Sequence, residues 1–151
     1  MKEALCFDDV LMVPKFSYVR SRTSVSLRSH LGRGERKLEL AFPIIPANMA
    51  TISESAMCDS ITAIGGIGLL HRFKSITWTL EEYKNCNTQQ RVGISFGVGT
   101  EEMERVQVLA NAGCKIFCFD IAHAASIHAL EQCRWFRLNY PKLFLIAGTF
   151  G

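Results

Sequence analysis

Polar and charged residues recur where apolar runs of the sequence end. Asn48 and Met49 close the run "PIIPANM", Arg72 follows "IGLLH", and Asp120 closes "IFCF". A carboxylate at the end of an apolar strand is costly unless it meets a ligand or a fixed donor. A pair of ribose hydroxyls is a natural ligand for Asp120, but this carboxylate could equally cap the next helix or pair with an arginine.

Other residues with chemical potential give weaker signals. His71 and His123 also lie at strand ends, where a lone histidine is more often a hydrogen-bonded structural residue. The Gly-x-Gly of "FGVGTEE" is neither a dinucleotide fingerprint nor a Walker motif. Cys114 and Cys118 would be roughly 13 Å apart in an extended segment, too far to share a metal. We therefore expect no metal site.

The apolar runs that precede these residues indicate parallel strands. They begin near residues 43, 67, 92, 114 and 143, roughly 22 to 29 residues apart, with helical patterns between them. Such near-continuous runs suit strands that are buried on both faces of a parallel sheet. Ligands of these sheets bind beyond the carboxyl ends of the strands. Alternation alone leaves open whether the sheet is a barrel or an open doubly wound sheet.

The helices between the strands have readable ends. Ser53 or Thr51 could begin the first helix, and Gly65 and Gly66 could end it. The stretch "TWTLEEYKNCN" is the weakest helical pattern. The later helices are expected to begin and end, respectively, at Thr100 and Gly113, and at Ser126 and Pro141. The expected inward residues of the last helix are Ile127, Leu130, Cys133, Phe136 and Tyr140.

The first 42 residues differ from the repeating part. The stretches "SVSLRSH" and "KLELAF" predict a hairpin around the basic, glycine-rich "LGRGERK". We expect this hairpin to cover one end of the barrel. No linker separates it from the repeat, so residues 1–151 are predicted to form a single domain, with an N-terminal segment and hairpin at 1–42 and β/α units at 43–151.

Composition excludes several classes of protein. The 151 residues are 48% hydrophobic and 21% charged, a globular mixture. The net charge of +3 is spread along the chain and argues against binding nucleic acid or a membrane surface. No signal peptide or spanning segment is visible, so we expect a cytoplasmic protein. Six cysteines without a C-x-x-C pair indicate buried free thiols.

Five stretches together resemble one family, that of the IMP dehydrogenases and GMP reductases. They are "LCFDDVLMVPKFS", "PIIPANMATIS", "GGIGLLHRF", "FDIAHAAS" and "LIAGTFG". The resemblance implies a (β/α)8 TIM barrel of which about the first five strands are present. GMP reductases are the more similar members, because IMP dehydrogenases usually carry paired CBS modules where this chain has only "NCNTQQR".

The resemblance also implies a reaction. NADPH would deliver hydride to the purine carbon of GMP as ammonia leaves, giving IMP through a covalent adduct on a catalytic cysteine. An IMP dehydrogenase lacking the CBS modules, which would use NAD, is one alternative. A non-catalytic partial-barrel interaction module is another, and an unrelated β/α-barrel enzyme is the third.

Site residues follow from the resemblance position by position. Arg72 would lie beside the reacting centre as a catalytic residue. The nucleotide substrate would be bound by Asn48, Met49, Gly148 and Thr149. The cofactor would be bound by Asp120, Ala122 and Ser126.

The chain also departs from the family's pattern. Ala124 replaces a glycine of D-I-A-H-G-x-S, and Thr149 replaces the asparagine of A-G-N, which would alter hydrogen bonds of the pocket. No cysteine has the family's catalytic G-x-G-x-x-C context. We therefore expect no turnover from this chain alone. Five strands would leave two unpaired edges, so we also expect a homo-oligomer or binding of a complementary C-terminal half.

Overall fold

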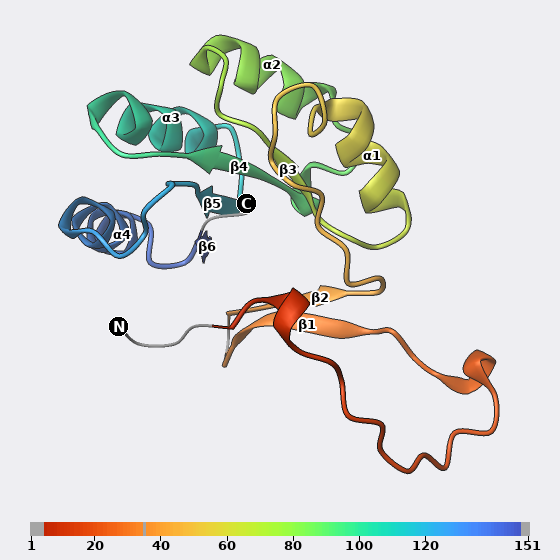
Figure 1. Cartoon of the computed structure of the whole chain (residues 1–151). Coiled ribbons are helices and arrows are strands. Elements are labelled where there is room, and N and C mark those ends of the chain that lie inside the picture. Colours follow the sequence, from red (N-terminus) through yellow and green to blue (C-terminus); the bar gives the residue numbers. More distant parts are fainter. Residues whose placement is uncertain (1–4, 35, 149–151) are drawn as a thin grey trace.

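The computed structural model describes residues 5–34 and 36–148 (Figure 1). An antiparallel hairpin is formed by β1 (Ser29–Arg33) and β2 (Arg36–Leu40). The parallel sheet contains β3 (Gly68–Leu70), β4 (Val92–Phe96), β5 (Ile116–Phe119) and β6 (Phe144–Ala147). The helices are α1 (Ser55–Ala63), α2 (Ile76–Asn85), α3 (Thr100–Asn111) and α4 (Ile127–Asn139). Short 3-10 turns occupy Phe7–Asp9, Arg22–Ser24 and Gln89–Arg91.

The order of the parallel strands is that of a barrel segment. The strands lie in chain order, β3-β4-β5-β6, and each neighbouring pair is parallel. A doubly wound sheet would reverse its order at a switch point, and the described strands contain no such reversal. The prediction of an α/β fold with a parallel, barrel-type sheet and an N-terminal hairpin is confirmed.

The first expected strand, at residues 43–49, is the exception. This segment follows the hairpin and reaches the start of β3, where the amide of Ile67 donates to the Ile44 carbonyl at 3.4 Å. It forms no strand, however, and the described sheet has four strands where five were expected. Pro43 and Pro46 explain the difference, because neither has an amide hydrogen to donate to a ladder.

Side chains alternate between the two faces of the sheet. One face packs against the helices through Ile94, Phe96, Phe117 and Phe119. The three phenylalanines of this face form an aromatic cluster with Phe136 of α4. The other face, which would line a barrel, holds a second cluster. Its members are Leu40, Ile67, Leu69, Ile116 and Cys118, with Leu31, Leu38, Ile45, Phe144 and Ile146 packed against them.

The second cluster places the hairpin at the amino ends of the parallel strands. Ile67, Ile116 and Phe144 lie at or next to the strand starts, and they pack with hairpin leucines. Arg91, immediately before β4, donates to the carbonyls of Gly65 and Gly66 at 3.3 Å and of Glu39 at 3.0 Å. The hairpin therefore covers this end of the sheet, away from the helices (Figure 1).

Most helix ends agree with the sequence predictions. Gly65 and Gly113 follow α1 and α3 with φ of +86° and +98°, which glycine adopts without strain. Ser126 caps α4 by accepting the Ala129 amide at 3.2 Å, and α4 ends before Pro141. The weak pattern at 76–85 does form a helix, α2, capped by Ser75.

Three predictions of helix caps and faces were wrong. The N-cap of α1 is Glu54, because Ser53 is buried and its amide bonds to the Met49 carbonyl. The N-cap of α3 is Gly99 at φ +110°, a conformation that the β-branched Thr100 would not adopt. On α4, the predicted inward residues Phe136, Cys133 and Tyr140 do pack in or against the core, but Ile127 and Leu130 are exposed. Ala129 and Gln132 are buried on this face instead. The small Ala129 side chain lets this face approach the sheet closely.

No helix in the described part of the chain has the length and apolar character needed to cross a membrane.

Candidate functional site

Arg72 and Asp120 meet at the carboxyl ends of β3 and β5. The Nε of Arg72 donates to Oδ2 of Asp120 at 3.4 Å. The Arg72 guanidinium also lies 4.9 Å from the centre of the Phe73 ring and covers Gly97, where a Cβ atom would be 3.2 Å from Arg72 Cζ. The sequence left open whether Asp120 binds a ligand, caps a helix or pairs with an arginine. In the structure it pairs with Arg72.

This ion pair is partly open to solvent. The side chains of Arg72 and Asp120 are 30% and 20% exposed. A pair of this kind contributes at most about 1 kcal/mol, because water already solvates both charges. A polar ligand that offers hydroxyl donors to Asp120 can therefore displace Arg72 from the carboxylate, or share the carboxylate with it, at small cost.

Asn48 and Met49 belong to the segment between the hairpin and α1, and Asn48 contacts β4, the strand that lies between β3 and β5. Asn48 is buried, and its Nδ2 donates to the Ser95 Oγ of β4 at 2.9 Å. Met49 is exposed and begins a tight turn, in which its carbonyl accepts the Ser53 amide at 3.0 Å. Thr51 in this turn has φ +64°, a left-handed conformation that is strained for a β-branched residue. Strained backbone conformations of this kind cluster at ligand-binding sites.

The expected cofactor loop follows β5. Ala122 is exposed in this loop, and the hydroxyl of Ser126 is used to cap α4. Ala124 and Gly148 line a cavity of about 160 Å3 together with Phe119 and residues of α4. The predicted substrate residue Thr149 lies outside the described residues. The structure thus brings Arg72 and Asp120 into contact and uses Ser126 in the local fold.

A larger cavity, not expected from the sequence, opens between α3 and α4. Its volume is about 610 Å3, and it is lined by Val98, Gly99, Met103, His128, Glu131, Gln132 and Trp135. The Nε2 atom of Gln132 is buried and has no hydrogen-bond partner within the described residues. A buried donor without a partner is costly. A glutamine in an otherwise apolar helix face was the only signal in the sequence.

Glu102 and Arg105 of α3 support the loop that passes under Arg72. One carboxylate oxygen of Glu102 accepts the Gly97 amide at 2.7 Å, and the other lies 3.3 Å from Arg105 Nε. Arg105 is buried and also donates to Thr79 Oγ1 at 2.8 Å and the Lys74 carbonyl at 2.9 Å. Glu102 is the third residue of α3, a position from which glutamate often bonds backbone amides before the helix.

The two histidines at strand ends have different surroundings. His71 is fully buried, its Nδ1 accepts the Phe73 amide at 3.2 Å, and its ring lies tilted against Trp78, with 5.0 Å between the ring centres. With Nδ1 as acceptor, a neutral ring carries its proton on Nε2, which faces Glu54 at 3.5 Å. His71 therefore has the structural role that the sequence favoured. His123 is exposed.

The buried cysteines are poor nucleophiles in this structure. The prediction of buried free thiols holds for Cys58, Cys86, Cys114 and Cys118, whereas Cys6 is exposed and Cys133 is partly buried. Burial raises the pKa of the Cys114 thiol to about 12, and burial together with the nearby Asp120 charge raises that of Cys118 to about 12. The pKa of Cys58 is also raised, first by a hydrogen bond with Cys86 and then by burial. Thiols of this kind stay protonated at neutral pH and are inert.

The fold and the position of the site define a class of protein, a partial β/α barrel with polar and charged residues at the carboxyl ends of its strands. The solved structure of inosine 5′-monophosphate dehydrogenase from Legionella pneumophila superposes with a TM-score of 0.85 at 36% identity, over 97% of this chain and 44% of that chain. Residues 4–151 match the IMP dehydrogenase / GMP reductase domain. The chain belongs to this family.

Relatives of both kinds match almost the whole chain. GMP reductase from Bacillus subtilis is 31% identical, over 100% of this chain and 46% of that protein. GMP reductase 2 from Bos taurus is 30% identical, over 96% and 43%. Inosine-5′-monophosphate dehydrogenase from Borreliella burgdorferi is 28% identical, over 98% and 48%. The chain thus spans about half the length of the curated relatives it matches.

Proposed function

We propose that this chain is part of a GMP reductase-type oxidoreductase, which converts GMP to IMP with NADPH and releases ammonia. The lengths of two alignments support a reductase over a dehydrogenase. The Borreliella burgdorferi dehydrogenase aligns over 199 positions although this chain has 151 residues, so roughly 50 of its positions have no counterpart here. The Bacillus subtilis reductase aligns with the whole chain over 154 positions. The chain therefore lacks an insertion that the dehydrogenase has and the reductase does not.

An IMP dehydrogenase without inserted modules is the second candidate. The identity of 36% to the Legionella pneumophila dehydrogenase favours it. The two candidates share the purine nucleotide and differ in the direction of hydride transfer. Assays with GMP plus NADPH and with IMP plus NAD separate them.

The site residues are proposed to act as follows. Asp120 accepts hydrogen bonds from ribose hydroxyls of the cofactor, and the Ala122–Ser126 loop borders it. Asn48, Met49, Gly148 and Thr149 surround the purine nucleotide, and Arg72 places a positive charge beside the reacting carbon.

The cavity between α3 and α4 fits an aromatic heterocycle of the cofactor. Its lining contains Met103, His128 and Trp135, whose apolar and aromatic surfaces suit a planar ring. NADPH, when bound, supplies the hydride, and the protein residues hold and orient the cofactor. Gly97 lets Arg72 lie close to the backbone beside Asp120.

The covalent step requires a thiolate that the described cysteines do not supply. Four of the six are buried with no exposed surface to offer a nucleotide, and Cys6 belongs to the N-terminal segment before the hairpin. Cys133 lies on α4, and burial raises its pKa. We therefore expect no turnover by the 151-residue chain, but we do expect it to bind the cofactor.

Replacing Asp120 by asparagine is expected to weaken NADPH binding at least tenfold. The amide keeps the shape of the side chain but loses the charge that strengthens hydrogen bonds from ribose hydroxyls. Titration followed by NADPH fluorescence measures the affinity. Asp8→Asn is the matched control, because Asp8 is exposed in the N-terminal segment. Equal affinity of the Asp120 and Asp8 variants would contradict the proposed role.

The N-terminal segment supports the proposal that the chain associates with itself or with a complementary half. Its exposed apolar side chains are Val10, Leu11, Met12, Val13, Phe16, Tyr18, Val19, Val25 and Leu27. Exposed apolar groups in this number usually mark an interface. We expect oligomers in sedimentation velocity at low micromolar concentration. A cooperatively melting monomer under the same conditions would overturn this expectation.

A further inference from the structure

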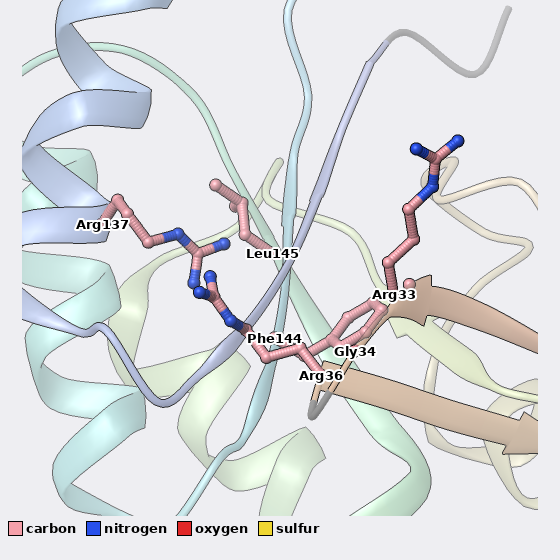
Figure 2. A pocket seen from close by; sticks show the side chains of 7 residues that line it. Arg33, Gly34, Arg36, Arg137, Phe144 and Leu145 are labelled. Carbon is pink, nitrogen blue, oxygen red and sulfur yellow. The ribbon is translucent and has the colours of Figure 1, made fainter.

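A basic cavity lies at the end of the sheet opposite the candidate site. Its volume is about 480 Å3, and it is bounded by the turn of the hairpin, the last turn of α4 and the start of β6 (Figure 2). The lining residues are Gly32, Arg33, Gly34, Arg36, Arg137, Phe144 and Leu145. The proposed reaction gives none of these residues a role.

Close packing fixes the hairpin turn against β6. Gly32 has φ +83°, and a Cβ atom there would clash with the Arg36 carbonyl and lie 2.9 Å from the Phe144 ring. Only glycine fits both the conformation and the space. The position of Arg36 relative to β6 is therefore set by the fold.

Arg137 is held from the opposite side. Its Nη1 donates to the Leu143 carbonyl at 3.0 Å and to the Pro141 carbonyl at 3.5 Å, and its guanidinium lies 5.9 Å from the centre of the Phe136 ring. Burial, followed by the neighbouring Arg36 charge, lowers the pKa of Arg137. An arginine nevertheless keeps its proton in proteins, so both charges persist.

Two like charges thus face each other. Figure 2 shows the guanidinium groups of Arg36 and Arg137 side by side, while that of Arg33 points away from them. Within residues 5–34 and 36–148, neither Arg36 nor Arg137 forms an ion pair. Glu35 belongs to the same turn but lies outside the described residues. The repulsion between the two guanidiniums falls when an anion lies between them.

We propose that this cavity binds a phosphate-bearing small molecule, with the phosphate between Arg36 and Arg137. Guanidinium groups match phosphate oxygens through paired hydrogen bonds, and two of them neutralise a dianion. Phe144 and Leu145 provide an apolar wall for the remainder of the molecule. The volume is within the range of small-molecule sites and exceeds what one phosphate needs.

The cavity is separate from the candidate active site. Ser126 and Arg137 lie at opposite ends of α4, and the rise of a helix puts them roughly 17 Å apart. Arg36 and Arg137 also lie at the amino ends of the strands, whereas Arg72 and Asp120 lie at the carboxyl ends. The proposal therefore stands or fails independently of the oxidoreductase function.

Isothermal titration of the 151-residue chain with inorganic pyrophosphate and with ADP, in a buffer free of phosphate, tests the site. We expect saturable binding of pyrophosphate at submillimolar concentration and a loss of about tenfold or more in Arg36→Gln and Arg137→Gln. Arg36 is exposed, so its variant should fold even if Arg137→Gln does not. Tighter binding of ADP, equally sensitive to Arg36→Gln, would identify a nucleotide as the occupant.

Arg33→Gln is the matched control, since it removes the same charge from the same turn but from a guanidinium that points away. It should change the affinity less than threefold. An equal loss in Arg33→Gln and Arg36→Gln would show general attraction to a basic surface and overturn the proposal. Absence of binding to the native chain would also overturn it.

Discussion

Replacing Glu102 by alanine is expected to lower the free energy of unfolding by about 3 kcal/mol or more. The substitution leaves the Arg105 guanidinium in the interior without its carboxylate partner, since the Arg105 side chain is only 2% exposed. It also leaves the Gly97 amide without its acceptor. Breaking one side of a buried pair costs more than the pair contributes, because the remaining charge is neither solvated nor neutralised.

Urea denaturation of the native chain and variants measures this effect. Glu101→Ala is the matched control, because Glu101 is the preceding residue of α3 and is exposed. Its effect should stay within about 0.5 kcal/mol. The double variant Glu102→Gln/Arg105→Met should recover much of the loss, because it removes the buried charge. Equal destabilisation by the two glutamate variants would show that the pair is not buried as described.

The same network has a consequence for the candidate site. Gly97 lies directly under the Arg72 guanidinium, and Glu102 fixes the Gly97 amide. Through Thr79 and the Lys74 carbonyl, Arg105 further ties α3 to the segment that follows Arg72. Loss of Glu102 should therefore disturb the position of Arg72 relative to Asp120 as well as the stability.

The sequence allowed the strands after residue 66 and most helix ends to be predicted, because these depend on local chemistry. Near-continuous apolar runs without prolines favour buried strands of a parallel sheet. Gly65, Gly113 and Ser126 act on the backbone within a few residues of themselves. The segment 43–49 was wrongly predicted to be a strand from its apolar residues, because its two prolines have no amide hydrogen to donate to a neighbouring strand.

The contacts of the site could not be predicted in the same way. Asn48 bonds Ser95 and Arg72 bonds Asp120 across 47 and 48 residues of chain. The pairing between Arg105 and Thr79 spans 26 residues. Only the strand order and the packing of α2 against α3 bring these side chains together. The resemblance to a family singled out Arg72 and Asp120 as separate site residues, but it did not indicate that they bind each other.

Stability is expected to fall steeply above pH 9 because of buried thiols. Burial raises the pKa of Cys114 and of Cys118 from 9.0 to about 12. In the unfolded chain these thiols ionise near pH 9, whereas in the folded protein they stay neutral up to about pH 12. Their contribution to stability is thus complete below pH 9 and is lost between pH 9 and 12. At 1.36 kcal/mol per pKa unit, each thiol accounts for about 4 kcal/mol across this window and about 2 kcal/mol by pH 10.5.

Urea denaturation at pH 8 and pH 10.5 measures the loss, and cysteine variants assign it. Burial also raises the pKa of Tyr83 to about 12, which adds to the decline above pH 10. Cys118→Ala should lose about 2 kcal/mol less than the native chain between the two pH values, even if it is less stable at pH 8. Cys6→Ala is the matched cysteine control, because Cys6 is exposed in the folded chain. A decline of Cys118→Ala in parallel with the native chain and with Cys6→Ala would show that the Cys118 thiol does not cause the loss, and the prediction would be wrong.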